Sequence, residues 1–117
     1  MARISTHVLD LVLGRPAANL RVELFRVSPG SREVISSAVT NSDGRTDPPL
    51  LTADAIETGN YELVFHAGEY LRVSGAPVNE PPFFEEIPVR FHVSAARGNY
   101  HVPLLLAPHG YSTYRGS

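Results

Sequence analysis

Alternation of apolar and polar residues with a period of two is the feature that most constrains the fold of this chain. The alternation is clearest in three runs: residues 20–25, 61–66 and 87–93. It places apolar side chains on one face of a β-strand and mostly polar ones on the other. Between the runs, clusters of Gly, Pro, Asn and Asp predict turns. We therefore expect a single all-β domain over residues 1–117, built as an antiparallel sandwich or barrel.

Helical structure has little room between these strands. Residues 68–74 are expected to form a short helix of a turn or two. Residues 76–86 contain three prolines and are expected to form an irregular connection. A chain of 117 residues is long enough to bury a core without a disulfide or a structural metal.

Composition excludes several chemistries. The chain has no Cys, which rules out a thiolate nucleophile and Cys-ligated zinc. It has no Lys, which rules out a Schiff base. The 10 Arg and 12 Asp plus Glu give a formal net charge of −2, so we expect no nucleic-acid partner.

The hydropathy of the chain predicts where the protein resides. No apolar run approaches the roughly 20 residues of a membrane-spanning helix, so no membrane association is expected. The first residues lack the apolar stretch of a signal peptide. The expected compartment is the cytoplasm, with a peroxisome as the alternative in a eukaryotic host.

Two segments carry apolar residues on both faces of a predicted strand: residues 4–13 and residues 100–106. Strands of this kind are usually covered on both faces. In a domain this small, a second subunit is the natural cover for the outer face. We therefore predict a homo-oligomer.

Two histidines lie on these doubly apolar strands. Alternation places His7 on the face of Leu9 and Leu11, and His101 on the face of Pro103 and Leu105. An imidazole on a covered face must find polar partners or stay neutral. Each histidine alone is as well explained by a structural role, but the pair favours a shared site.

The other three histidines, His66, His92 and His109, have polar neighbours or lie beside a turn, so we expect them at the surface. The five histidines show no short ligand spacing. We therefore expect neither a metal site nor a cofactor.

Two polar segments are further candidates. The run Asn41-Ser42-Asp43-Gly44-Arg45 predicts a turn, with positive φ at Gly44. Arg45 is either a solvated side chain or a planar donor for a carbonyl or oxyanion. The ending from Tyr111 to Ser117 is either a frayed edge strand or an ordered tail whose last carboxylate is a fixed acceptor.

Several motifs together resemble the 5-hydroxyisourate hydrolases, the transthyretin-related enzymes of purine catabolism. The matching segments are Thr6-His7-Val8-Leu9-Asp10, Gly14-Arg15-Pro16-Ala17, Thr40-Asn41-Ser42-Asp43-Gly44-Arg45, Phe83-Phe84, Ile87-Pro88-Val89, Tyr100-His101-Val102-Pro103-Leu104-Leu105-Leu106 and Tyr114-Arg115-Gly116-Ser117. The terminal Tyr-Arg-Gly-Ser carries most weight, because it distinguishes the hydrolases from the transthyretin carriers. The resemblance departs at Asn99, where the family often has His, and at Glu85, where it often has Pro.

The resemblance implies a transthyretin-like sandwich of two four-stranded sheets with one short helix, assembled as a homotetramer with active sites between its dimers. It implies hydrolysis of 5-hydroxyisourate to 2-oxo-4-hydroxy-4-carboxy-5-ureidoimidazoline, without metal or cofactor. By position, His7, Arg45, His101 and Ser117 match the catalytic set. His7, Arg45 and Tyr114 match the substrate-binding positions.

Two other functions are compatible with such a scaffold. A transthyretin-like carrier would hold a small ligand without turnover, and fold alone does not separate a carrier from an enzyme. A secreted interaction domain is disfavoured by the absence of Cys. The residues do not divide the acid and base roles between His7 and His101.

Overall fold

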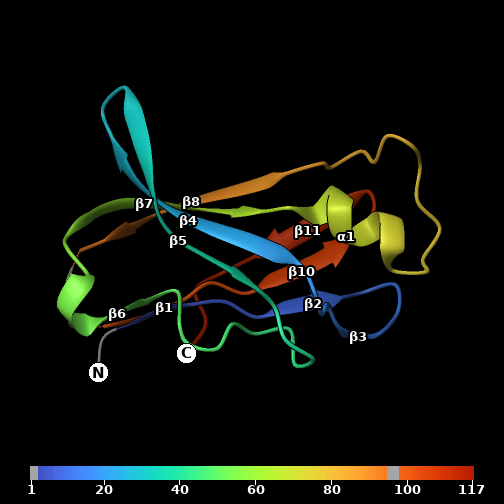
Figure 1. Ribbon diagram of the computed structural model, residues 1–117, viewed down its shortest axis with the longest axis horizontal. Coiled ribbons are helices and arrows are strands. Elements are labelled where there is room, and N and C mark those ends of the chain that lie inside the picture. The colour runs from blue at the N-terminus through green and yellow to red at the C-terminus, as the bar shows by residue number, and fades with distance from the viewer. Residues whose placement is uncertain (1–2, 95–97) are drawn as a thin grey trace.

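The structure is a computed structural model that describes residues 3–94 and 98–117. One layer is an antiparallel four-stranded sheet in the order β5-β4-β7-β8. Its strands are β4 (Arg21–Ser28), β5 (Ser31–Val39), β7 (Gly59–Phe65) and β8 (Ile87–Val93). Figure 1 shows the β4–β5 hairpin projecting from the rest of the molecule.

The opposite layer consists of two shorter sheets. A three-stranded sheet has the order β6-β1-β9, and a four-stranded sheet has the order β11-β10-β2-β3. Their strands are β1 (Arg3–Ser5), β2 (Val8–Asp10), β3 (Arg15–Pro16), β6 (Leu51–Thr52), β9 (Asn99–His101), β10 (Leu104–Ala107) and β11 (Gly110–Thr113). The pairs β1–β9 and β2–β10 are both parallel.

The expected division into two four-stranded sheets is therefore wrong in detail. The second layer is interrupted where β1 gives way to β2 and β9 to β10. Pro103 has no amide hydrogen to donate to the ladder, and His7 pairs in an isolated bridge with Arg45 of another segment. The amides of Val102 and Leu104 still donate across the gap, to Ser5 and His7, each at 2.9 Å.

A hydrophobic core fills the space between the two layers. Fully buried side chains come from both, including Leu24, Leu63 and Phe65 of one and Ile4 and Leu104 of the other. Leu24, Leu63 and Phe65 are inward positions of the alternating runs, whereas Ile4 and Leu104 come from the two segments that are apolar on both faces. The all-β expectation is confirmed, and the two layers pack face to face.

One short helix closes an end of the sandwich. α1 (Ala67–Val73) confirms the helix expected over residues 68–74, and lies at the opposite end from β1 and β6 (Figure 1). A single 3₁₀ turn, η1 (Ala53–Ala55), follows β6. The connection from α1 to β8 is irregular, as expected. The described residues contain no helix long and apolar enough to cross a membrane.

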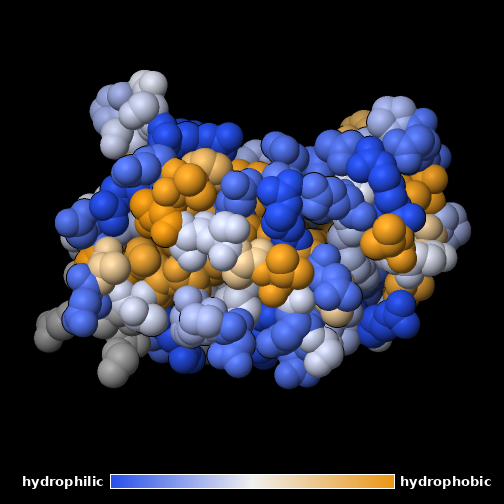
Figure 2. Space-filling view, in the orientation of Figure 1, coloured by the Kyte–Doolittle hydropathy of each residue, from blue (hydrophilic) through white to orange (hydrophobic). Residues whose placement is uncertain are grey.

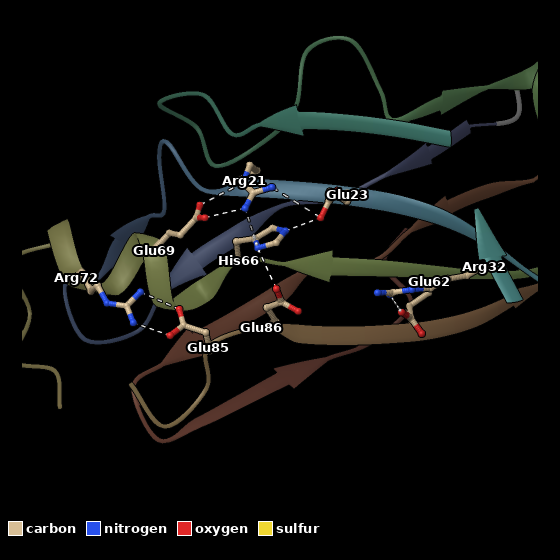
Figure 3. Close-up of polar contacts among 9 residues, drawn as sticks. All are labelled: Arg21, Glu23, Arg32, Glu62, His66, Glu69, Arg72, Glu85 and Glu86. Atoms are coloured by element: carbon tan, nitrogen blue, oxygen red, sulfur yellow. Dashed lines mark hydrogen bonds and ion pairs between the residues drawn. The ribbon is translucent and has the colours of Figure 1, made fainter. Parts of the chain in front are cut away.

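The surface expectation for His66 is wrong, whereas His92 and His109 are exposed as expected. His66 follows β7, and its side chain is 9% exposed. Its Nε2 donates to Glu23 at 2.6 Å, and the Arg21 guanidinium donates to Nδ1 at 3.2 Å. Figure 3 shows the imidazole enclosed by Arg21, Glu23 and Glu86. Charged neighbours from other elements therefore replace solvent around His66.

The outer face of β7 is also buried further along the strand. Glu62 is 6% exposed although alternation places it away from the core. Arg32 of β5 donates to its carboxylate at 2.5 Å (Figure 3). Arg90 of β8 also donates to this carboxylate, at 3.1 Å. One guanidinium group from the neighbouring strand β8 and one from the edge strand β5, two strands away, thus cover this central carboxylate.

Apolar side chains also reach the surface, where Figure 2 shows them lying between hydrophilic groups. The large exposed ones among the described residues are Leu11, Val12, Val34, Val39, Val73, Phe83, Tyr111 and Tyr114. Leu9 and Leu105 of the second layer are half-buried.

Candidate active site

A tight turn places Arg45 beside His7. Gly44 has φ of +76°, and its carbonyl accepts from the Val8 amide at 2.8 Å. A side chain at position 44 would collide with the Val8 carbonyl, so the turn approaches β2 this closely only with glycine. The Asn41 side chain accepts from the amides of Asp43 and Arg45 at 2.9 and 3.2 Å. The predicted turn is confirmed, and it sets Arg45 opposite His7.

The parallel pairing of β1 with β9 places His101 opposite Ser5. The Ser5 Oγ lies 2.9 Å from Nδ1 of the His101 imidazole, within hydrogen-bond distance. Both residues are half-buried. The hydroxyl therefore fixes one ring nitrogen of His101 at the end of the strand pair.

The C-terminal tail is ordered and lies against β9. β11 pairs with β10, and the Thr113 hydroxyl donates to the Pro103 carbonyl at 2.7 Å. The Arg115 guanidinium stacks 4.3 Å from the Tyr100 ring centre and donates to the Asn99 carbonyl at 3.0 Å. The tail thus packs against β9 as the ordered alternative predicts, while β11 is an edge strand of its sheet, as in the other alternative.

Gly116 brings the tail into contact with His101. Its amide donates to the His101 carbonyl at 2.7 Å. A Cβ at position 116 would lie 2.6 Å from Cδ2 of the His101 ring and 3.3 Å from Cγ of Pro103. Close passage of the backbone over the imidazole therefore requires a residue without a side chain, which explains the glycine before Ser117.

These elements surround a cavity of about 190 Å³, here named the His101 cavity. Its wall consists of Arg3, Ser5, Thr6, Arg45, Thr46, Pro49, Asn99, His101 and Ser117. Three of the four residues predicted as catalytic, Arg45, His101 and Ser117, therefore meet at one cavity. They come from a turn, a strand end and the C-terminal tail.

His7 and Tyr114 lie differently. His7 does not line the His101 cavity, but it is near enough to His101 to affect the pKa of that imidazole. Tyr114 lines a second hollow of about 230 Å³, together with Phe91 of β8 and Tyr100 of β9. Within one chain, Tyr114 and the His101 cavity are thus separate.

Electrostatics keep both histidines neutral at neutral pH. Burial lowers the pKa of His101 below 6.5, and the charges of Arg45, of His7 when it is protonated, and of Arg3 lower it further. Burial and Arg45 likewise lower the pKa of His7. A neutral imidazole can accept a proton from water, and a charged guanidinium beside it can stabilise an oxyanion.

Several residues of the cavity wall were not among the predicted site residues. Ser5 precedes His7 by two positions, so strand alternation could have placed it on the same face. Thr46 carries a buried Oγ1 without a hydrogen-bond partner among the described residues. Asn99, where the resemblance departs from the family, also lines the cavity. No group of three or more acidic or His side chains in residues 3–94 and 98–117 is placed to hold a metal ion.

Known proteins that are similar to this chain in sequence and structure include 5-hydroxyisourate hydrolases. "5-Hydroxyisourate hydrolase 2" of Rhizobium meliloti (strain 1021) is 53% identical over 115 residues, 98% of this chain and 96% of the relative. A solved 5-hydroxyisourate hydrolase of Klebsiella pneumoniae superposes with a TM-score of 0.80 and 32% identity, over 100% of this chain and 94% of that one.

A crystal structure of (S)-allantoin synthase gives a TM-score of 0.91 and 39% identity over 99% of this chain. The match spans only 44% of the synthase, so this chain corresponds to less than half of that protein. Residues 4–116 also match the model of one protein family, the HIUase/Transthyretin family. The chain belongs to the HIUase/Transthyretin family.

Proposed function

We propose that this chain hydrolyses 5-hydroxyisourate to 2-oxo-4-hydroxy-4-carboxy-5-ureidoimidazoline, a ring opening in urate degradation. The observation that carries the proposal is the meeting of Arg45, His101 and Ser117 at one cavity, in a chain 53% identical to a relative named for this hydrolysis. A carrier would need a cavity but no proton-transfer groups.

The reaction requires three operations. Water adds to a ring carbonyl, the resulting oxyanion is stabilised, and the adjacent C–N bond breaks as its nitrogen takes a proton. Neutral His7 and His101 accept the proton of water and return one to the leaving nitrogen, and their lowered pKa values favour the accepting form. No metal or cofactor is assigned to these steps.

The remaining assignments concern charge and orientation. Arg45 stays protonated, binds the substrate and stabilises the oxyanion. A chain that ends at Ser117 carries an α-carboxylate at the cavity wall, and we assign to it a hydrogen bond from an active-site donor. His7 and Tyr114 contact the substrate.

We further propose a homotetramer with the active sites between its dimers. The half-buried Leu9 and Leu105 and the exposed Leu11 support a covered outer face on the second layer. Such an assembly would let Tyr114 act at a cavity of another subunit. A monomer in light scattering at micromolar concentration would contradict it.

The test is an ultraviolet assay in which urate oxidase generates 5-hydroxyisourate and its decay is followed with and without this protein. The expected result is a decay far faster than the spontaneous one, unchanged by a metal chelator. A spontaneous rate from a folded oligomer would reject the enzyme in favour of a ligand carrier.

A further inference from the structure

The His101 imidazole is held on two sides by groups that do not themselves carry a charge. On one side, Nδ1 lies 2.9 Å from the Ser5 hydroxyl. On the other, the backbone of Gly116 passes so close to Cδ2 that no Cβ would fit. These contacts leave the Nε2 and Cε1 edge of the ring for the His101 cavity, whose wall His101 forms.

We propose that Ser5 is a positioning residue, whose hydroxyl holds the His101 imidazole with Nε2 directed into the cavity in both of its neutral tautomers. The basis is that a serine hydroxyl has one donor and two acceptor sites. It donates to a bare Nδ1 when Nε2 carries the proton, and accepts from Nδ1–H when Nε2 is bare. The ring keeps its orientation in either state.

His66 shows what a different partner does. Its Nε2 faces the Glu23 carboxylate at 2.6 Å, and its Nδ1 faces the Arg21 guanidinium. A carboxylate only accepts and a guanidinium only donates, so neither Glu23 nor Arg21 can exchange its hydrogen-bonding role. A second carboxylate, that of Glu86, lies 3.7 Å from Nδ1. A histidine that takes a proton from water and passes it to a leaving nitrogen changes its protonation during turnover. A hydroxyl partner accommodates that change without a new contact.

The inference rests on the proposed role of His101, so the variants are chosen to separate the two. Ser5→Val removes the hydroxyl. Ser5→Thr retains the hydroxyl in a side chain of nearly the same shape and volume as valine. His101→Gln removes the proposed proton-transfer group. Thr40→Val is the stability control, because the buried Thr40 hydroxyl donates to the Ala17 carbonyl at 2.6 Å and accepts from the Leu20 amide at 2.9 Å, outside the cavity wall.

The measurements are kcat, KM and the pH dependence of kcat/KM in the ultraviolet assay, with the unfolding temperature of each variant. Ser5→Val is expected to lower kcat about 10–100-fold with little change in KM, since a misplaced ring loses its reactive geometry. Ser5→Thr is expected to stay within about threefold of the parent on the same principle. Thr40→Val is expected to lower the unfolding temperature without changing the pH profile.

The pH profile separates positioning from a merely structural effect. The bond that the hydroxyl accepts from the Nδ1–H of a protonated ring is charge-assisted and stronger than its bond to the neutral ring. Loss of the hydroxyl therefore disfavours the charged form and lowers the pKa of His101 further. The acid limb of the Ser5→Val profile is therefore expected at lower pH than that of Ser5→Thr.

Three outcomes would overturn the inference. Equal kcat and equal pH profiles in Ser5→Val and Ser5→Thr would show that the hydroxyl is dispensable. A rise in KM alone would assign Ser5 to substrate binding instead. If His101→Gln itself turns over normally, the proposed catalytic role of His101 fails first, and the positioning role falls with it.

Discussion

Polar side chains are enclosed by charged partners in one layer of the sandwich and lie beside a cavity in the other. On the β5-β4-β7-β8 layer, His66 and Glu62 are enclosed by charged partners at 2.5–3.2 Å (Figure 3). On the other layer, His101 has a hydroxyl on one nitrogen and a cavity beside it. Among the described residues it makes no ion pair with an acidic side chain.

The extent of hydrogen-bond pairing distinguishes a structural from a reactive polar group in this fold. Complete pairing occupies the hydrogen-bonding atoms of a group and leaves none of them for a substrate. Incomplete pairing next to a cavity leaves one ring nitrogen available, and burial with neighbouring cations keeps it neutral. This distinction predicts separate effects of substitutions on turnover and on stability.

Removal of residues 114–117 should have the largest effect. It eliminates Ser117 from the cavity wall and the backbone that covers the His101 ring. Activity should fall at least about 10²-fold, because the ring loses its orientation, while circular dichroism still reports a folded β protein. Normal turnover by the truncated chain would show that the tail lies outside the site.

Gly116→Ala tests the close approach of the tail alone. The added Cβ would lie 2.6 Å from Cδ2 of His101, so either the ring or the tail must shift. We expect kcat to fall about 10–100-fold, since a displacement near 1 Å costs that much at a reactive group. Gly110→Ala is the matched control, because a Cβ there meets no atom within 4 Å. Equal activity of the two variants would contradict the close approach.

Glu62→Gln should affect stability and leave turnover unchanged. The substitution weakens two charge-assisted hydrogen bonds, from Arg32 and Arg90. Both arginines are about half exposed, so solvent compensates for part of the loss. The free energy of unfolding in urea should fall by about 1–2 kcal/mol. A loss of kcat at unchanged stability would remove the distinction between the layers.

Arg3→Gln should cause the smallest change, in the pH profile. Arg3 is the weakest of the causes that lower the pKa of His101, after burial, Arg45 and His7. A base must be neutral, so activity declines as the pH falls through this lowered pKa, on the acid side of 6.5. Removing Arg3 raises the pKa of His101. The acid limb of the pH profile therefore moves to higher pH by a fraction of a pH unit.

The dependence on salt concentration gives a second test of the Arg3 effect. Arg3 is exposed, so added salt should screen its charge and reduce the difference between Arg3→Gln and the parent. A shift of the acid limb to lower pH in the variant would contradict the electrostatic cause.

The strands and turns were predictable because their signals are local. Alternation places Leu24 and Leu63 in the core, and the Asn41–Gly44 run specifies a positive φ at Gly44. His66 was not predictable, because Glu23 and Arg21 lie 43 and 45 residues away in the sequence. A polar sequence neighbourhood does not show which charges a second strand contributes.

The site was predictable only in part. The meeting of Arg45, His101 and Ser117 followed from resemblance, since nothing local to any of them indicates the others. The contacts that Ser5 and Gly116 make with His101 depend on the parallel register between β1 and β9 and on the packing of the tail against β9. Both are long-range features. The break in the second layer likewise depends on the bridge between His7 and Arg45.

The most direct measurement compares His101→Gln with His66→Gln in both turnover and stability. His101→Gln should lower kcat about 10²–10⁴-fold, as expected when a proton-transfer group is lost, with little change in the free energy of unfolding. His66→Gln should leave kcat within about twofold of the parent and lower the free energy of unfolding by about 1–3 kcal/mol, because Glu23 and Arg21 lose a partner. Equal losses of kcat in the two variants, or the reverse assignment, would contradict the division between an enclosed and a reactive histidine.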